Sequence, residues 1–302
     1  MQANRLPRIK YRNPIMTDRM KDLSVRTLSG IALAAIVIGA TLWSKWSFGA
    51  LMFFVVIGGT AEFYRLCRRC GIAPLEGIGI VSAAGLFLLS FNIFMQFGGN
   101  GVQPSTGAAV LGTVLFLLLM VPTAFVCELW RKSATPIANV AATFTGVLYV
   151  ALPVSLLIYV PLLFADGEWQ PWIMLCYIFI IWVNDVFAYL VGVCFGRHRM
   201  CSRISPKKSW EGFFGGVTAS VIAGVVCGYL LGGDMFVWGV LALIVSVTGV
   251  AGDFVESLFK RSAGVKDSGA IMPGHGGFLD RFDAMLVSAP YAFVYLLILG
   301  NC

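Results

Sequence analysis

Nine long apolar runs, separated by short charged or Gly- and Pro-rich breaks, constrain this chain more than any other feature. A hydrocarbon core takes about 20 apolar residues as a helix, and the runs are close to that length. Barrel strands would be about ten residues long with alternating polarity, so run length favours helices. We predict an all-α polytopic integral membrane protein with nine transmembrane helices. The predicted spans are 25–44, 47–66, 76–96, 107–128, 136–164, 171–196, 212–232, 235–258 and 284–300.

The composition agrees with a membrane protein. Of the 302 residues, 58% are apolar and only 12% are charged, whereas a soluble domain carries about 25% charged residues. A single soluble core of this size would lack the polar groups to cover it. The composition therefore excludes an ordinary soluble enzyme, a disordered chain and a collagen-like fibre. Within the fifth span, Pro153 and Pro161 predict a kink or tilt.

The positions of the cations predict how the chain is oriented. Of the 22 Lys and Arg residues, all but Lys45 fall in the first 26 residues or follow the second, fourth, sixth or eighth span. The opposite loops contain Asp166, Glu168 and Asp234. This positive-inside pattern predicts a cytoplasmic N-terminus and an external C-terminus. The net charge of +7 is therefore a topology signal, and we expect no nucleic-acid partner.

We expect three regions along the chain. They are a basic cytoplasmic leader at 1–26, N-terminal transmembrane helices at 27–165 and a C-terminal transmembrane catalytic region at 166–302. The eight cysteines are scattered, mostly inside apolar runs. Cys67 and Cys70 have metal-site or redox spacing, but no second pair or nearby histidine completes a site, so we expect ordinary thiols.

Carboxylates inside apolar runs are costly and point to function. Glu62 and Glu128 lie near helix ends beside Arg65 and Arg131, which predicts interfacial ion pairs. Asp185 differs because it lies in the middle of the sixth span. It would serve either as a polar contact between helices or as a functional group. We favour a functional role because its span leads directly into a basic loop.

That loop combines five cations with hydroxyls, Gly and Pro at a membrane surface, a composition that suits phosphate binding. Charge alone also fits a loop that only orients the helices. Charge alone therefore does not decide between phosphate binding and helix orientation. His198, among the arginines, is either a substrate contact or a surface residue.

The densest set of chemistry-bearing residues lies at the end of the eighth span and the start of the ninth. On a helix, Asp253, Glu256 and Lys260 share one face because they recur every three or four residues. Asp280 and Asp283 share a face for the same reason. Such hard oxygen ligands favour Mg²⁺ over Zn²⁺.

Residues 274–277, which read Gly-His-Gly-Gly, connect these two helix ends. They can turn sharply and present backbone N–H groups to an anion. Metal-binding acids, phosphate-binding cations and a glycine-rich turn are the parts of a phosphoryl or nucleotidyl transfer site. His275 would be a general base, a phosphate donor or only a loop residue.

At these residues the sequence resembles the phosphatidate cytidylyltransferase family, also called CDP-diacylglycerol synthases. The family signature spans residues 257–283, and residues 184–212 also look like family segments. The specific match covers about 175–290, whereas the N-terminal half matches only in hydrophobic character. The signature appears as Ser257, Lys260-Arg261, Lys266-Asp267, His275-Gly276-Gly277 and Asp280-Arg281-Phe282-Asp283.

The resemblance implies that CTP and phosphatidate are converted to CDP-diacylglycerol and pyrophosphate, a step of phospholipid biosynthesis. It also implies a homodimer in the bacterial cytoplasmic (inner) membrane, with the active site facing the cytoplasm. A divalent cation, Mg²⁺, would be required, and a second cation is an open option. The acids matching Asp253 and Asp280, with Asp283, would form the metal centre.

The site residues follow from this resemblance together with the chemistry of each side chain. A phosphomonoester has a second pKa near about 6, so the lipid phosphate needs no general base. The predicted catalytic residues are Asp253, Asp280, Lys260, Ser257 and His275. The predicted substrate-binding residues are Asp185, Arg197, Lys207, Lys208, Arg261, Lys266, Asp267, Gly276, Gly277 and Arg281.

Three alternative functions remain open at this point. A CTP-dependent polyprenol or dolichol kinase would attack the γ-phosphate and release CDP instead of pyrophosphate. A CDP-archaeol synthase would share the chemistry but take ether lipids. A cation transporter would use the same acids as an ion path, but a transport site belongs near the midplane between repeats, and no half-to-half symmetry is evident.

Overall fold

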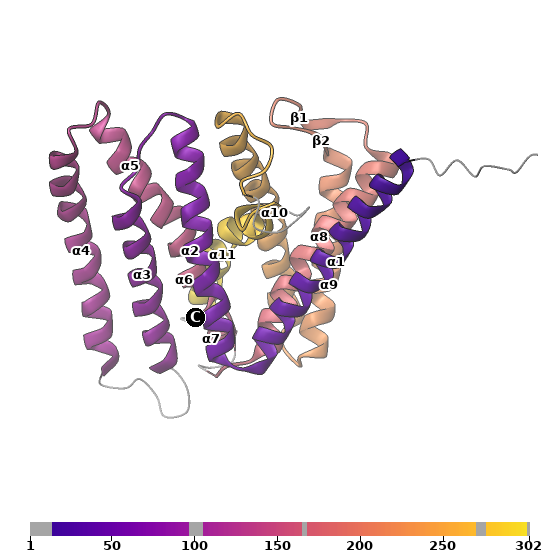
Figure 1. The fold of residues 1–302 in the computed structure, drawn as a ribbon. Helices are drawn as coiled ribbons and strands as arrows, with labels where there is room; N and C mark the ends of the chain where they lie inside the picture. The colour runs from indigo at the N-terminus through magenta and orange to yellow at the C-terminus, as the bar shows by residue number, and fades with distance from the viewer. Residues whose placement is uncertain (1–13, 97–104, 165–167, 270–275, 301–302) are drawn as a thin grey trace, which may run out of the picture.

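The chain forms a bundle of long helices that run back and forth (Figure 1). The computed structural model describes residues 14–96, 105–164, 168–269 and 276–300. The N-terminal helices are α1 (Pro14–Trp43), α2 (Lys45–Arg69), α3 (Glu76–Gln96) and α4 (Ser105–Arg131). A broken helix follows as α5 (Pro136–Gly146), the π-helix η1 (Val147–Ala151), α6 (Leu152–Leu157) and α7 (Val160–Phe164). The rest comprises α8 (Pro171–Phe195), β1 (Arg199–Cys201), β2 (Ser205–Ser209), α9 (Trp210–Leu230), α10 (Met235–Ser262) and α11 (Leu279–Gly300).

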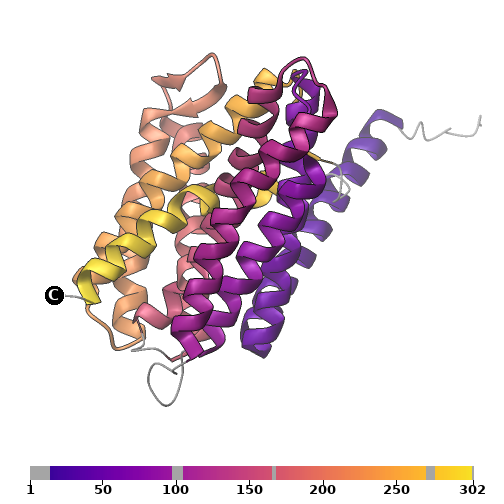
Figure 2. The ribbon, with the colours of Figure 1, turned by 90° about the vertical axis from the view of Figure 1, so that its left-hand side faces the viewer.

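The predicted class, a polytopic helical membrane protein, is confirmed. Within the described residues, 8 helical segments are long and apolar enough to cross a membrane, and they match eight of the nine predicted spans. The prediction at 25–44 falls on α1, whose apolar part, Thr27–Trp43, is shorter. Figure 2 shows the long helices side by side when the bundle is turned by 90°. The antiparallel β1–β2 hairpin is an addition that hydropathy does not predict.

The basic connections gather at one end of the bundle because consecutive helices run in opposite directions. The hairpin, the start of α1 and the α4–α5 connection all lie at the upper end of the bundle in Figure 1. Lys45, at the start of α2, lies at the other end. The charge pattern therefore matches the fold.

Small residues at every fourth position of α9 allow it to pack closely between α8 and α10. A Cβ added at Gly212 would lie 2.6 Å from the Ala188 carbonyl oxygen of α8. A Cβ added at Gly224 would lie 2.5 Å from the Ala242 Cβ of α10. Such small-residue stripes are how helices approach closely in lipid. The buried stripe consists of Gly212, Gly216, Ser220, Gly224 and Gly228.

The kink predicted in the fifth span is present. Pro153 has no N–H, so a regular helix would leave the Tyr149 carbonyl without its partner. The chain widens into η1 just before this proline, and the Leu152 N–H bonds the Val147 carbonyl instead. The helix breaks again before Pro161, near the start of α7.

We expect Gly224→Ala to lower the thermal stability of the protein in detergent. The added methyl group has no space between α9 and α10, and such overpacking costs about 1–3 kcal/mol. Gly112→Ala in α4 is the matched control because a Cβ there meets nothing within 4 Å. Equal melting temperatures for the two variants would contradict the proposed packing of α9.

Candidate functional site

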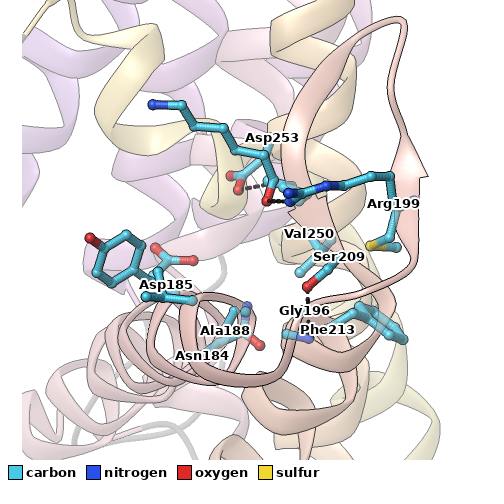
Figure 3. A pocket seen from close by; sticks show the side chains of 16 residues that line it. Asn184, Asp185, Ala188, Gly196, Arg199, Ser209, Phe213, Val250 and Asp253 are labelled. Atoms are coloured by element: carbon cyan, nitrogen blue, oxygen red, sulfur yellow. Dashed lines mark hydrogen bonds and ion pairs between the residues drawn. The ribbon is translucent and has the colours of Figure 1, made fainter.

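A cavity of about 640 Å³ opens between α8, α9, α10 and the hairpin at the basic end of the bundle. Figure 3 shows the Asp185 and Asp253 carboxylates pointing toward the same open space, with Arg199 on the hairpin beside it. Lys207 and Lys208 also line the cavity. Four of the predicted substrate and metal residues, from three separate elements, therefore meet at one cavity.

An ion pair crosses this cavity. The Lys208 Nζ lies 2.5 Å from Asp253 Oδ2 and 4.7 Å from the centre of the Phe254 ring. Asp185 interacts electrostatically with both Asp253 and Lys208. The neighbouring residue, Asn184, is buried where α9 approaches α8 at Gly216. Asn184 therefore forms the contact between the two helices, and Asp185 lines the cavity.

Glu211 fixes the hairpin against the start of α9. Its carboxylate accepts hydrogen bonds from the backbone N–H groups of Arg197 and His198, each at 3.1 Å, and lies 2.6 Å from His198 Nδ1. On the other strand, the Ser209 hydroxyl accepts from the Gly212 N–H and caps α9. These bonds place the predicted phosphate-binding loop along the cavity.

A second polar cluster lies deeper, where α10 meets α11. The Lys260 Nζ lies 2.6 Å from Asp280 Oδ1 and also forms an ion pair with Glu256. Asp280 Oδ2 accepts from the Ser268 N–H at 2.9 Å, the Ser268 hydroxyl at 2.8 Å and the Gly277 N–H at 2.9 Å. Donors within the protein thus use almost all of the hydrogen-bonding capacity of the Asp280 carboxylate. Its bonds to Ser268 and Gly277 join the two ends of the connection between α10 and α11, here called the signature loop.

Glu62 of α2 reaches the same loop from the N-terminal half. Its side chain is fully buried, and Oε2 accepts from the Ser268 hydroxyl at 3.1 Å and the Leu279 N–H at 3.0 Å. A Cβ at Gly269 or Gly277 would overlap this carboxylate. The predicted pairing with Arg65 is therefore wrong. No spacing in the sequence connects Glu62 to a loop more than 200 residues away, so sequence reasoning missed this contact.

The ion pair predicted between Glu128 and Arg131 is confirmed at 3.0 Å. Glu128 is buried and also accepts from Ser133 and Asn139, which join the end of α4 to the start of α5. This pair belongs to the framework of the bundle, away from the cavity.

Asp283 connects the cavity with the deeper cluster. Gly252 of α10 packs directly on the backbone of Asp283, where a Cβ would overlap the α11 chain. This close crossing places Asp283 beside the turn of α10 that carries Asp253, and its carboxylate interacts electrostatically with those of Asp253 and Glu256. Two carboxylates from different helices therefore meet at one point.

The Asp253–Asp283 pair fits a divalent cation. Mg²⁺ typically keeps several waters and uses one or two carboxylates together with substrate phosphates. Among the described residues no group of three or more His, Cys, Asp or Glu side chains could hold a metal ion, so this part of the chain offers a pair of ligands at most. Asp280, the other predicted ligand, has its own set of donors.

The structure distributes the other predicted residues around these two clusters. Gly276 has a φ of +78°, in the left-handed region that favours glycine. Arg261 donates to the Val265 carbonyl and closes the end of α10. Ser257 is half-buried on α10, and His275 lies outside the described residues. The side chains of Arg197, Lys266, Asp267 and Arg281 are exposed.

Comparison with known proteins places the whole chain in one family. The profile described as the Cytidylyltransferase family matches residues 24–299. A phosphatidate cytidylyltransferase of Mycobacterium bovis is 30% identical, over 92% of this chain and 90% of the relative. Those of Synechocystis and Staphylococcus aureus (strain COL) are 30% and 32% identical, over 91% of this chain and 96% and 99% of the relatives.

We expect Lys260→Met to destabilise the protein strongly because it leaves the buried Glu256 and Asp280 carboxylates without their shared cation. Removing one partner of a buried ion pair costs about 3–5 kcal/mol. Adding Glu256→Gln to this variant should restore part of the loss, since it removes one of the two carboxylate charges. Thermal unfolding in detergent measures both effects, with Lys132→Met at an exposed position as the control. A double variant no more stable than Lys260→Met would contradict the charge argument.

Proposed function

We infer the function of this chain from its family: it belongs to the phosphatidate cytidylyltransferases, and we propose that it makes CDP-diacylglycerol and pyrophosphate from CTP and phosphatidate. One observation carries the proposal beyond the family. Asp253 lines a cavity that opens at the basic end of a membrane bundle and pairs there with Lys208, and the crossing of α10 and α11 brings Asp283 close to it. Carboxylates for a cation and lysines for phosphates thus stand together where a lipid headgroup and a nucleotide can meet.

The reaction forms one bond and breaks one bond. A phosphate oxygen of phosphatidate attacks the α-phosphorus of CTP, and the bond from that phosphorus to the β-phosphate oxygen breaks. Pyrophosphate leaves with the electron pair. Because the phosphate of phosphatidate is largely ionised near neutral pH, no side chain has to remove a proton from it. The site must instead neutralise the charge of an anion that approaches a triphosphate.

We propose that Asp253 and Asp283 hold Mg²⁺. When bound, the cation would offset negative charge on the phosphates that react and orient them. A second cation at Asp280, which the family resemblance implies, would have to displace Lys260 from that carboxylate. The bonds of Asp280 to Ser268 and Gly277 support a role in shaping the signature loop as well.

The hairpin cations would bind phosphate groups. Lys208 neutralises Asp253 in the described structure. With a divalent cation held at Asp253, the Lys208 ammonium would be free to bind a phosphate oxygen in the same cavity. Lys207 and Arg199 line the same cavity and add positive charge. Charge-assisted bonds of this kind are about twice as strong as neutral ones.

The outer face of α8 supports the access of a lipid. Tyr189 and Val193 line the cavity and are 70% and 67% exposed on the surface of the bundle. Acyl chains can therefore remain beside α8 in the bilayer while the phosphate headgroup reaches the lysines. A soluble substrate would need no such lipid-facing wall.

The side of the membrane follows from the positive-inside rule. We propose that the end with the hairpin faces the cytoplasm, where CTP is made, and that the protein lies in the bacterial cytoplasmic membrane, in keeping with its bacterial relatives. The homodimer implied by the resemblance remains part of this proposal. Cross-linking in native membranes would test the dimer, and labelling of Cys70 from either side of sealed vesicles would test the orientation.

The decisive assay uses purified protein, Mg²⁺, phosphatidate and CTP labelled at the α-phosphate. We expect lipid-borne label and an equimolar amount of pyrophosphate. Release of CDP without label in the lipid would identify a lipid kinase instead. An ether-lipid acceptor that is strongly preferred over phosphatidate would indicate a CDP-archaeol synthase. The absence of turnover in a well-folded sample would favour the alternative function, a cation transporter.

We expect Asp253→Asn and Asp283→Asn each to lower kcat at least about 100-fold, because each removes half of the proposed cation site. Asp234→Asn is the control, since Asp234 caps α10 at the opposite end and asparagine also caps helices. Melting temperatures of all three variants should remain close to that of the wild type. Near-normal turnover in either site variant would refute the metal assignment.

A further inference from the structure

Tyr149 carries a polar group that neither the sequence motifs nor the proposed mechanism uses. Its hydroxyl is buried and has no hydrogen-bond partner in the structure. A buried polar group without a partner costs about 1–3 kcal/mol, and most such groups in proteins are satisfied. An exception next to a reaction site therefore requires an explanation.

The backbone presents this tyrosine in an unusual way. Tyr149 lies in the middle of η1, the π-helical turn over Val147–Ala151 that precedes Pro153. Because a π-turn holds one extra residue, it rotates the side chains within it away from their α-helical directions. Single π-turns of this kind occur frequently at functional sites.

Two aromatic rings hold the Tyr149 ring in place. Phe63 of α2 lies 5.9 Å away, and Phe259 of α10 packs edge-on at 5.2 Å, measured between ring centres. Such pairs stabilise by about 0.5–1.5 kcal/mol beyond the area they bury. The ring is fixed between the two halves of the chain, so its hydroxyl has a defined direction.

The charged groups around Tyr149 are carboxylates, and η1 packs against α11, the helix that carries Asp283. Tyr149 interacts electrostatically with three of them, Asp283, Glu256 and Asp253, and Asp283 contributes the most. Of these, Asp253 pairs with Lys208 and Glu256 with Lys260. No ion pair is formed by Asp283 among the described residues, and its own N-terminal turn supplies one bond, from the Ala284 N–H. Asp283 is thus the carboxylate with the greatest need of a donor.

We propose that Tyr149 is a positioning residue for the metal site: when a divalent cation is bound, its hydroxyl, which is unpaired in the described structure, donates a hydrogen bond to the Asp283 carboxylate and orients it toward the cation shared with Asp253. This inference rests on the proposed function, and it assigns the N-terminal half of the chain a direct part in the site. A carboxylate has two oxygens, so one can face the cation while the other accepts from the tyrosine. Donors that orient metal ligands typically change metal affinity by about 10–100-fold.

The test measures Mn²⁺ binding to the full-length protein in detergent, without substrates. Electron paramagnetic resonance detects the bound and free Mn²⁺. We expect Tyr149→Phe to weaken Mn²⁺ binding by about 10–100-fold, and to raise the Mg²⁺ concentration needed for half-maximal turnover in the same proportion. The melting temperature without metal should not fall, because phenylalanine keeps the ring contacts and removes an unpaired hydroxyl.

Tyr64→Phe is the matched control. The Tyr64 hydroxyl is also buried beside Phe63, but it donates to the Thr143 carbonyl at 2.7 Å. This variant should lower the melting temperature and leave Mn²⁺ affinity unchanged. The two tyrosines should thus show opposite effects on metal affinity and on stability.

Three outcomes would overturn the inference. Mn²⁺ affinity of Tyr149→Phe within twofold of the wild type would show that the hydroxyl does not act on the metal site. A fall in metal-free melting temperature as large as that of Tyr64→Phe would show a structural role. A wild-type protein that binds no Mn²⁺, while Asp253→Asn still abolishes turnover, would overturn the metal assignment and this inference with it, but would leave the cytidylyl transfer reaction in place.

Discussion

The arrangement of this protein depends on the cost of placing several carboxylates in a low-dielectric interior with few cations. Asp253, Asp283, Glu256 and Asp280 lie within one crossing of α10 and α11, and Lys208 and Lys260 are the cations that pair with them among the described residues. Burying an ion without a partner costs several kcal/mol. This excess of negative charge would favour binding of a cation, in keeping with the Mg²⁺ site proposed at Asp253 and Asp283.

Close backbone contacts make this concentration of charge possible. Gly252 lets α11 cross α10 without a gap, and the crossing puts Asp283 against Asp253. Gly269 and Gly277 do the same for the signature loop, which folds directly onto Glu62. In a membrane, helices gain little from hydrophobic association, so small residues and buried hydrogen bonds supply much of the specificity. The same glycines that shape the loop therefore also fix the positions of the acids.

The sequence predicted what depends on composition and local spacing. Run length gave the helical spans, the charges gave a single basic end, and the spacing of Asp253 and Lys260 placed them on one helix. It did not predict contacts that join distant segments. Glu62 has no local feature that distinguishes it from an acid at the membrane interface. The ion pair between Asp280 and Lys260 could not be predicted from their spacing in the motif. The hairpin escaped prediction because its strands are short and basic, without the apolar alternation that marks a strand.

The proposed phosphate-binding role of Lys208, together with its ion pair to Asp253, would link the affinities for cation and phosphate. In the described structure its ammonium neutralises Asp253, so a divalent cation that binds there must break this ion pair. The released ammonium would then face the cavity, where a phosphate oxygen would replace the lost carboxylate. Binding of one ligand would thus remove a cost from binding of the other, and by thermodynamic linkage the effect would be equal in both directions. Such a site would favour the nucleotide together with its cation over either one alone, because each one alone would leave one member of the Lys208–Asp253 pair without a partner.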